Sequence, residues 1–297
     1  MDEFEKQSMK RILLTGGAGF IAHHTIRHLL QNTDWEIVSL DRLDYSGNLN
    51  RISDMMVEFD KETQKRVRIV HHDLRAELNE MLTADLGNFD YIVHMAASSH
   101  VDRSIEDPMT FVLDNVVATC NILNFGRKQK NLERFIYFST DEVFGPAPKG
   151  VNYKERDRYN STNPYSATKA GGEELCVAFE NTYDMPIYIT HTMNVFGERQ
   201  HPEKFIPMTI KNARDGNMVT IHSDRDKKIP GSRHYIHAKD VADGMLFLLQ
   251  NQNKIDNLPN DYGGAKCPKF NLVGPVEWDN LMLAQKIAMS QNKELKY

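Results

Sequence analysis

The sequence has few cysteines and no excess of basic residues. Its 297 residues include three cysteines, Cys120, Cys176 and Cys267, which lie far apart and are odd in number. This pattern predicts reduced thiols rather than a disulfide framework. Lysine and arginine total 36 against 41 aspartates and glutamates, a formal net charge of -5. Nucleic-acid-binding proteins need a basic surface, so we expect no nucleic-acid partner.

Long apolar runs and metal-binding spacings are also lacking. No apolar stretch approaches the roughly 20 residues that cross a bilayer, so we expect no membrane partner. Residues 1–6 are acidic and lack an apolar core, which is not the pattern of a signal peptide. The 12 histidines show no spacing typical of metal ligands. Together these features predict a cytoplasmic protein without a metal.

A strand, a glycine turn and a helix follow one another near the N-terminus. Arg11–Leu14 is a short apolar strand, the pattern Gly17-x-Gly19-x-x-Ala22 follows it, and a helical pattern then continues. This order is the context of a dinucleotide-binding fingerprint. Glycines allow the backbone to approach a pyrophosphate, and the helix N-terminus favours its negative charge. The candidate cofactor contacts here are Gly16, Gly19, Phe20 and Ile21.

A second strand, Glu36–Leu40, ends at Asp41. An acid at this place accepts hydrogen bonds from the adenine-ribose hydroxyls and favours NAD over NADP. Arg42 leaves an alternative open, because a neighbouring arginine could bind the 2′-phosphate of NADP. The ends of this strand and of the next two, Val67–Asp73 and Tyr91–Met95, supply further candidate cofactor contacts. They are Asp41, Arg42, Leu43, Asp44, Gly47, Asp73, Leu74, Met95, Ala96, Ala97 and Ser98.

Strands and helical patterns alternate through most of the chain, which predicts an α/β fold with a doubly wound parallel sheet. A helix is expected from Pro108 to about Phe125, and a further strand at Ile187–Thr190. Between them a fifth strand begins at Arg134 and runs into Ser139-Thr140-Asp141-Glu142. The carboxyl ends of such strands face the ligand crevice.

Two interpretations of Asp141 and Glu142 stand side by side. Adjacent strand residues point to opposite faces, so both acids can address one substrate only if the chain already turns at Thr140. In that case burial and mutual repulsion can raise the pKa of one acid while the other stays ionised. The alternative is a helix cap, with Thr140 or Asp141 opening a helix and Glu142 close to its positive end.

Tyr165 and Lys169 open a helix that continues to about Tyr183. Their spacing places both side chains on one helical face. There the ammonium group can lower the pKa of the phenol below its usual value of about 10 and help to hold a ribose. On the order of one such spacing is expected by chance. After the nucleotide fingerprint and Ser139-Thr140, however, it predicts a catalytic pair.

The motifs resemble a known family. The start Thr15-Gly16-Gly17-Ala18-Gly19-Phe20-Ile21, with Asp41, Tyr165 and Lys169, resembles the extended short-chain dehydrogenase/reductase (Rossmann) superfamily, whose members act on nucleotide sugars. Thr140-Asp141-Glu142, His100–Ile105 and Pro202–Pro207 look like signatures of dTDP-glucose 4,6-dehydratases within it. The resemblance covers almost the whole chain. It implies NAD as the cofactor and a homodimer formed through the helices near Pro108 and Tyr165.

The resemblance also implies a division into domains. It places an NAD-binding domain at residues 1–195 and a smaller substrate domain at 196–297, with residues of about 231–252 packing back on the first. A helix from Phe205 and a strand at Met218–His222 fit this second domain. Arg233 would pair with the diphosphate of the sugar nucleotide, although a surface salt bridge is the alternative. The implied substrate contacts are Ser99, Thr140, Asn194, Lys204, Arg233 and Asn271.

The implied reaction converts dTDP-glucose or UDP-glucose to its 4-keto-6-deoxy form, with Thr140, Asp141, Glu142, Tyr165 and Lys169 as catalytic residues. A nucleotide-sugar epimerase or decarboxylase, or a non-catalytic NAD-binding scaffold, are the alternatives. Two features depart from the family pattern. An Arg-Pro-Gly-His-Asp motif that helps to close the nucleotide site is not found in the sequence. The sequence therefore does not indicate which nucleotide base the substrate carries. Asp114 stands where a small hydroxyl residue is expected beside the nicotinamide.

Overall fold

A seven-stranded parallel sheet forms the centre of the computed structural model, which describes residues 9–148, 150–258 and 267–297. Residues 1–6, where we expect no signal peptide, lie outside the described residues. The strand order is β3-β2-β1-β4-β5-β6-β9, and every neighbouring pair is parallel. The bounds are β1 Arg11–Thr15, β2 Glu36–Asp41, β3 Val67–His71, β4 Tyr91–His94, β5 Arg134–Thr140, β6 Ile187–Thr192 and β9 Lys269–Leu272. The order reverses between β1 and β4, the place where this fold class binds ligands.

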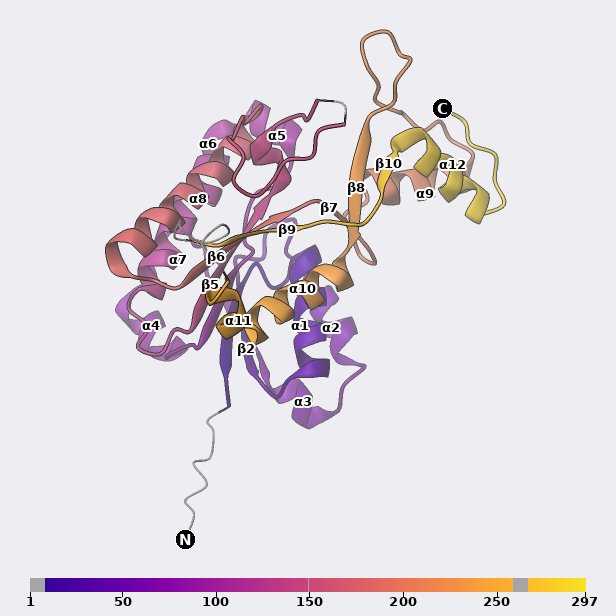
Figure 1. The fold of residues 1–297 in the computed structure, drawn as a ribbon. Helices are drawn as coiled ribbons and strands as arrows, with labels where there is room; N and C mark the ends of the chain where they lie inside the picture. Colours follow the sequence, from indigo (N-terminus) through magenta and orange to yellow (C-terminus); the bar gives the residue numbers. More distant parts are fainter. Residues whose placement is uncertain (1–8, 149, 259–266) are drawn as a thin grey trace.

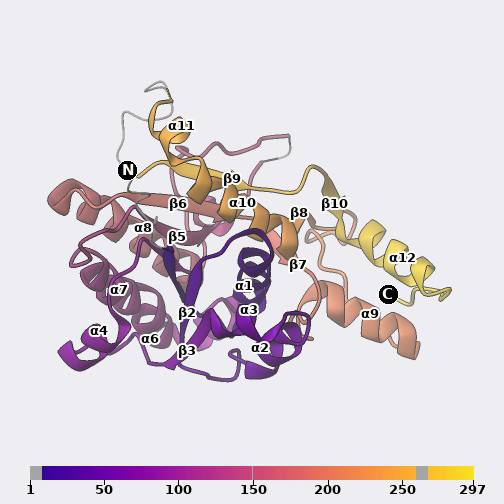
Figure 2. The same ribbon diagram turned by 90° about the horizontal axis from the view of Figure 1, so that it is seen from below.

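Helices cover both faces of the sheet (Figure 1, Figure 2). One layer holds α1 Phe20–Asn32, α2 Leu49–Met56, α3 Lys61–Lys65 and α10 Ala238–Gln250, followed by α11 Gln252–Asp256. The other holds α4 Glu80–Leu86, α5 Val101–Glu106, α6 Pro108–Val112, α7 Ala118–Gly126 and α8 Pro164–Tyr183. Strand β1 packs Ile12 and Leu14 into one core and Leu13 into the other. Because both faces of the central strands are buried, these strands are mostly apolar, whereas the edge strand β3 is more exposed. The predicted doubly wound sheet is confirmed.

The helix expected from Pro108 to Phe125 contains an irregular segment. Residues Leu113–Val117 form a π-helical turn between α6 and α7. Within it, Asp114 and Asn115 are buried. Such turns occur often at functional sites, since the extra residue redirects side chains.

A second, three-stranded sheet lies beyond the carboxyl ends of the large one. It consists of β7 Asn194–Phe196, β8 Ser232–His237 and β10 Glu277–Asp279. Helices α9 Phe205–Asp215 and α12 Asn280–Ser290 lie next to it (Figure 1).

The strand predicted at Met218–His222 is wrong. This stretch makes only an isolated bridge from Met218 to Lys296, and the Val219 amide donates to the Lys296 carbonyl at 2.8 Å. Val219 is buried, but Met218 is 71% exposed. The short apolar run is therefore held by the end of the chain and joins neither sheet.

The C-terminal third of the chain contributes to both parts of the molecule. Helix α10 packs Val241 and Met245 against Ile26 and Leu29 of α1. Strand β9 extends the large sheet beside β6. The boundary between residues 195 and 196 stays a prediction. Among the described helices, none has the length and apolar character needed to span a membrane.

Two adjacent glycines of α8 differ in how closely they pack. A Cβ atom at Gly172 would lie 2.1 Å from the hydroxyl of Tyr137, which is completely buried. At Gly171 the nearest atom would be a methyl group of Val116 at 3.5 Å. We therefore expect Gly172→Ala to lower the free energy of unfolding by about 1 to 3 kcal/mol. Gly171→Ala, the matched control, should raise it by up to about 1 kcal/mol. Urea unfolding of both variants tests this, and equal effects would contradict it.

Candidate active site

The glycine turn after β1 is shaped for close approach of a ligand. Gly16 has φ +70°, and a Cβ atom there would lie 2.9 Å from the Cα atom of Ala96. The Thr15 hydroxyl accepts hydrogen bonds from the Met95 and Ala96 amides, both at 3.1 Å, so it ties the end of β1 to the end of β4. Helix α1 begins directly after Gly19. The turn and helix N-terminus together form a cradle that fits a pyrophosphate.

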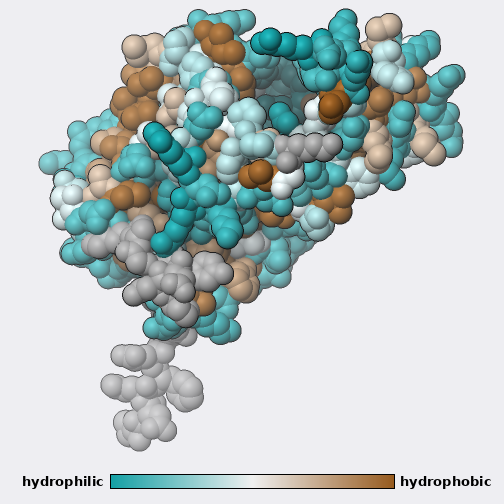
Figure 3. Space-filling model, turned by 45° about the horizontal axis from the view of Figure 1, so that its top comes forward, coloured by the Kyte–Doolittle hydropathy of each residue, from teal (hydrophilic) through white to brown (hydrophobic). Residues whose placement is uncertain are grey.

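Two adjoining cavities extend from this turn in opposite directions, and both are lined by Gly16, Gly19, Met95 and Ala97. The surface is hollowed near the top of Figure 3, and hydrophilic residues predominate around that hollow. At one end the predicted cofactor residues that line the cavity are Asp41, Arg42, Asp44, Asp73, Leu74, Ala96 and Ser98. At the other end the predicted residues are Phe20, Ile21, Ser99, Thr140, Asp141, Glu142, Tyr165, Lys169, Asn194 and Lys204. The structure thus places the predicted cofactor and catalytic residues along one groove.

Asp41 is held rigidly at one end of this groove. Its carboxylate accepts hydrogen bonds from the amides of Ala18 at 3.0 Å and Leu43 at 2.8 Å. A Cβ atom at Gly47 would lie 2.7 Å from Asp41 Oδ1. Leu43 and Gly47, which we predicted as cofactor contacts, are therefore placed behind Asp41 and outside the lining of both cavities.

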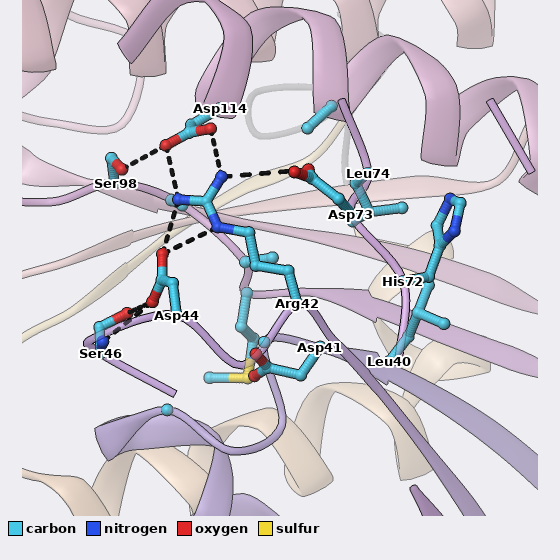
Figure 4. A pocket seen from close by; sticks show the side chains of 16 residues that line it. Leu40, Asp41, Arg42, Asp44, Ser46, His72, Asp73, Leu74, Ser98 and Asp114 are labelled. Atoms are coloured by element: carbon cyan, nitrogen blue, oxygen red, sulfur yellow. Dashed lines mark hydrogen bonds and ion pairs between the residues drawn. The ribbon is translucent and has the colours of Figure 1, made fainter. Parts of the chain in front are cut away.

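Arg42 forms a bidentate ion pair with Asp114 (Figure 4). The two hydrogen bonds measure 2.6 and 2.8 Å, and the Asp114 side chain is only 3% exposed. From the resemblance we expected Asp114 at a position beside the nicotinamide. It lies instead at the Asp41 end, because the π-helical turn that carries it faces the ends of β2 and β4.

The acid pair follows β5 in a short 3₁₀ helix, Asp141–Phe144. Thr140 caps this helix, and its hydroxyl accepts a hydrogen bond from the Glu142 amide at 3.3 Å. The cap at Thr140 is confirmed, and both acids line the same cavity. That they act on one substrate stays a prediction. Burial, and then the Glu142 carboxylate, raise the pKa of Asp141 to about 6. Asn163 donates to Glu142 Oε2 at 3.2 Å and orients that carboxylate.

Tyr165 and Lys169 are buried on the first turns of α8, which a capping box at Asn163 begins. The Lys169 ammonium group donates to the Phe138 carbonyl at 2.7 Å, and burial lowers its pKa to about 8. Burial, together with Glu142, raises the pKa of Tyr165 above its usual value. Our expectation that Lys169 lowers the pKa of Tyr165 is wrong for the protein without its cofactor. Burial and the neighbouring carboxylates have the larger effect on this pKa.

A buried network behind the acid pair was not found from the sequence. Glu173 has no exposed surface and accepts a hydrogen bond from Ser139 at 2.5 Å. His191 and Lys269 approach the same carboxylate at 3.1 and 3.2 Å. Burial alone would raise the pKa of Glu173, but His191, Lys269 and Ser139 lower it to about 2. The sequence could have indicated Glu173 itself, because it lies one turn after Lys169 on α8. Its partners His191 on β6 and Lys269 on β9 are distant in sequence and could not be found this way.

The predicted substrate contacts divide into two groups. Ser99, Asn194 and Lys204 line the cavity that holds the acids. Arg233 is exposed and donates to the Ser232 carbonyl at 2.7 Å, outside that lining. Asn271 donates to the Tyr153 carbonyl at 3.4 Å, so it contacts the loop before α8 rather than the cavity. The cavity is also lined by residues that sequence reasoning missed, among them Met193, Gln200, Phe205, Ile206 and Tyr235. Within the described ranges, no group of three or more His, Cys, Asp or Glu side chains could hold a metal ion.

The raised pKa of Asp141 has a consequence for stability. In the folded protein the pKa of Asp141 is about 6, whereas the ordinary value is 3.8. The folded state therefore favours the protonated carboxyl, and the free energy of unfolding falls as the pH rises from the ordinary pKa through the folded one. We expect Asp141→Asn to be more stable than the parent by about 2 kcal/mol at pH 7.5. The difference should shrink toward zero near pH 4, where the parent carboxyl is protonated. Urea unfolding at several pH values measures it.

The control for this experiment is Asp85→Asn. Asp85 is 57% exposed and pairs with Arg68 on the surface, so its substitution should change stability by less than about 1 kcal/mol. A destabilisation of Asp141→Asn that is equal at all pH values would contradict the expectation.

The chain is similar to several known proteins. A family described as the NAD dependent epimerase/dehydratase family matches residues 12–262. The low-salt glycan biosynthesis protein Agl12 of Haloferax volcanii is 36% identical over 93% of this chain and 81% of its own length. The dTDP-glucose 4,6-dehydratase of Salmonella typhimurium is 36% identical over 80% of this chain and 68% of the enzyme.

A solved structure is similar over nearly the whole chain. DesIV, a dTDP-glucose 4,6-dehydratase from Streptomyces venezuelae with NAD bound, matches with a TM-score of 0.80 and 32% identity. The match covers 96% of this chain and 82% of DesIV. The resemblance drawn from the motifs is thus confirmed. The chain is an enzyme of the NAD dependent epimerase/dehydratase family, and its cofactor is NAD.

Proposed function

We propose that the enzyme is a nucleotide-sugar 4,6-dehydratase that converts dTDP-glucose or UDP-glucose to the 4-keto-6-deoxy sugar. The observation that carries the proposal is the acid pair: Asp141 and Glu142 line the same cavity as Tyr165, and the pKa of Asp141 is raised to about 6. Removing water from a sugar needs both a base and an acid, which this pair supplies. Epimerisation at C4 needs only the group that exchanges the C4 hydroxyl proton, and no second acid–base pair at C5 and C6.

The first step is oxidation at C4. NAD⁺, held by the Gly16–Gly19 turn and Asp41, would supply the hydride chemistry between C4 and C6. Tyr165 takes the proton of the C4 hydroxyl as a phenolate. Its raised pKa opposes that ionisation, so a nearby positive charge is needed. Lys169, with a pKa of about 8, is mostly protonated at neutral pH and lies four residues along the same helix.

The second step is loss of water. The C4 ketone acidifies the C5 hydrogen, and Glu142, oriented by Asn163, removes it as a proton. Asp141 donates its own proton to the C6 hydroxyl, which leaves as water. When the hydride reaches C6, Glu142 returns its proton to C5. The sugar then leaves with its ketone at C4.

Thr140 connects the two acid–base centres. Its hydroxyl donates to Asp141 Oδ1 at 3.3 Å and lines the same cavity as Tyr165, where its polar group acts to lower the pKa of the phenol. One turnover leaves Tyr165 protonated and Asp141 ionised. A relay through Thr140 returns the proton from the phenol to the carboxylate, which restores both groups for the next cycle.

Incubation with NAD⁺ and a panel of nucleotide-glucoses tests the proposal. We expect a product lighter by one water, with the hydrogen of C4 recovered at C6, because the hydride returns within the same site. Mass spectrometry with substrate deuterated at C4 detects both changes. A C4 epimer of unchanged mass would instead identify an epimerase, and tight NAD binding without turnover on any nucleotide-glucose would support the scaffold alternative.

Substitution of the acids separates the two steps. We expect Asp141→Asn and Glu142→Gln to retain C4 oxidation, seen as NADH absorbance, and to lose at least about a hundredfold in water elimination. Glu174→Gln, at an exposed position on α8, is the control and should match the parent. Release of the 4-keto-6-deoxy product at the parent rate by either acid variant would overturn the roles assigned here. The homodimer remains a prediction from the family resemblance, and the cytoplasmic location remains a prediction from the composition and the N-terminal residues.

A further inference from the structure

Carboxylates hold the Arg42 guanidinium group on two sides (Figure 4). Both terminal nitrogens bond to the Asp114 carboxylate, at 2.6 and 2.8 Å. The Nε atom donates to Asp44 at 2.8 Å, and Asp73 lies 4.0 Å from Nη1. All three nitrogens of the arginine are therefore directed at carboxylates.

The position of Arg42 makes this arrangement relevant to cofactor choice. It follows Asp41, whose carboxylate lies where this fold binds the 2′-hydroxyl of the adenine ribose. An arginine beside that site is the usual partner for the 2′-phosphate of NADP, because its planar fork binds phosphate oxygens in pairs. Here the guanidinium group of Arg42 is already paired with the Asp114 carboxylate.

The charge around the site also disfavours a phosphate. The carboxylates of Asp44, Asp73 and Asp114 face the guanidinium groups of Arg42 and Arg75, and the Asp41 carboxylate lines the same cavity. The cluster as a whole is negative. A 2′-phosphate would add about two more negative charges next to it.

Asp114 is the best anchored partner of Arg42. Its side chain is 3% exposed, against 28% for Asp44 and 40% for Asp73. Ser98 donates to Asp114 at 2.6 Å, and the Arg75 guanidinium group lies 3.3 Å from it. Asp114 also accepts a hydrogen bond from each of the two terminal nitrogens of Arg42.

We propose that Asp114 determines the preference for NAD over NADP by holding Arg42 away from a 2′-phosphate. Asp114 acts as a specificity-determining residue through Arg42, and the preference depends on a pair that joins the end of β2 to the π-helical turn. The inference concerns nucleotide binding and does not depend on whether the enzyme is a dehydratase.

Isothermal titration of NAD⁺ and NADP⁺ into the full chain tests the proposal. We compare the parent, Asp114→Asn, Arg42→Ala and the double variant. Asp114→Asn keeps the side-chain shape but removes the charge, so Arg42 becomes available. We expect the affinity for NADP⁺ to rise about tenfold and that for NAD⁺ to change less than about threefold. In the Arg42→Ala background the gain for NADP⁺ should disappear.

Three outcomes would overturn the proposal. They are an unchanged ratio of NAD⁺ to NADP⁺ affinity in Asp114→Asn, an equal loss for both nucleotides, and a gain for NADP⁺ that persists without Arg42. Asp114→Ser provides a second variant, with a small hydroxyl group in place of the carboxylate, should the first fail to fold. Asp85→Asn, which removes an arginine partner on the surface, is the control and should change neither affinity.

Discussion

The ionised carboxylate of Glu173 joins the elements that carry the active site. It lies on α8 one turn after Lys169, and its hydrogen-bond partner Ser139 directly precedes Thr140 on β5. Its other partners are His191 on β6, Lys269 on β9 and the hydroxyl of Tyr159. A buried carboxylate is tolerated only when such partners are all present, and loss of one typically costs about 3 to 5 kcal/mol. The carboxyl ends of β5 and β6 and the start of β9 are therefore fixed relative to the helix that bears Tyr165.

Behind the acid pair, the Glu173 carboxylate is paired with His191 and Lys269. The Asp141 and Glu142 carboxylates instead lie next to each other. Asp141 is nearly enclosed, its closest charged neighbour is another carboxylate, and its pKa rises accordingly. Local instability of this kind is common where function requires a group in its less usual protonation state. The several partners of the Glu173 carboxylate give the rigidity that allows this strain to persist beside it.

The sequence could predict the features that depend on neighbouring residues. The glycine turn, the strand ends, the turn at Thr140 and the pair Tyr165 and Lys169 are all local patterns, and the structure places them along one groove. The Arg42–Asp114 pair and the ligands of Glu173 could not be predicted, because the partners meet only after β2, β6 and β9 have taken their places in the sheet. The same reason explains the error at Met218–His222: its apolar pattern suits a strand, but among the described residues no partner strand lies beside it.

The π-helical turn at Leu113–Val117 serves two sites with adjacent residues. Asp114 binds Arg42, while the Asn115 amide bonds to the backbone of Ser98 and to the Thr168 hydroxyl on α8. In a regular α-helix, neighbouring side chains differ in direction by about 100°. Deleting one residue from this turn would restore the regular helix and rotate one of the two side chains out of its site. The length of this segment is thus constrained by nucleotide selection and by the placement of the catalytic helix together, so insertions and deletions should be far less tolerated here than point substitutions.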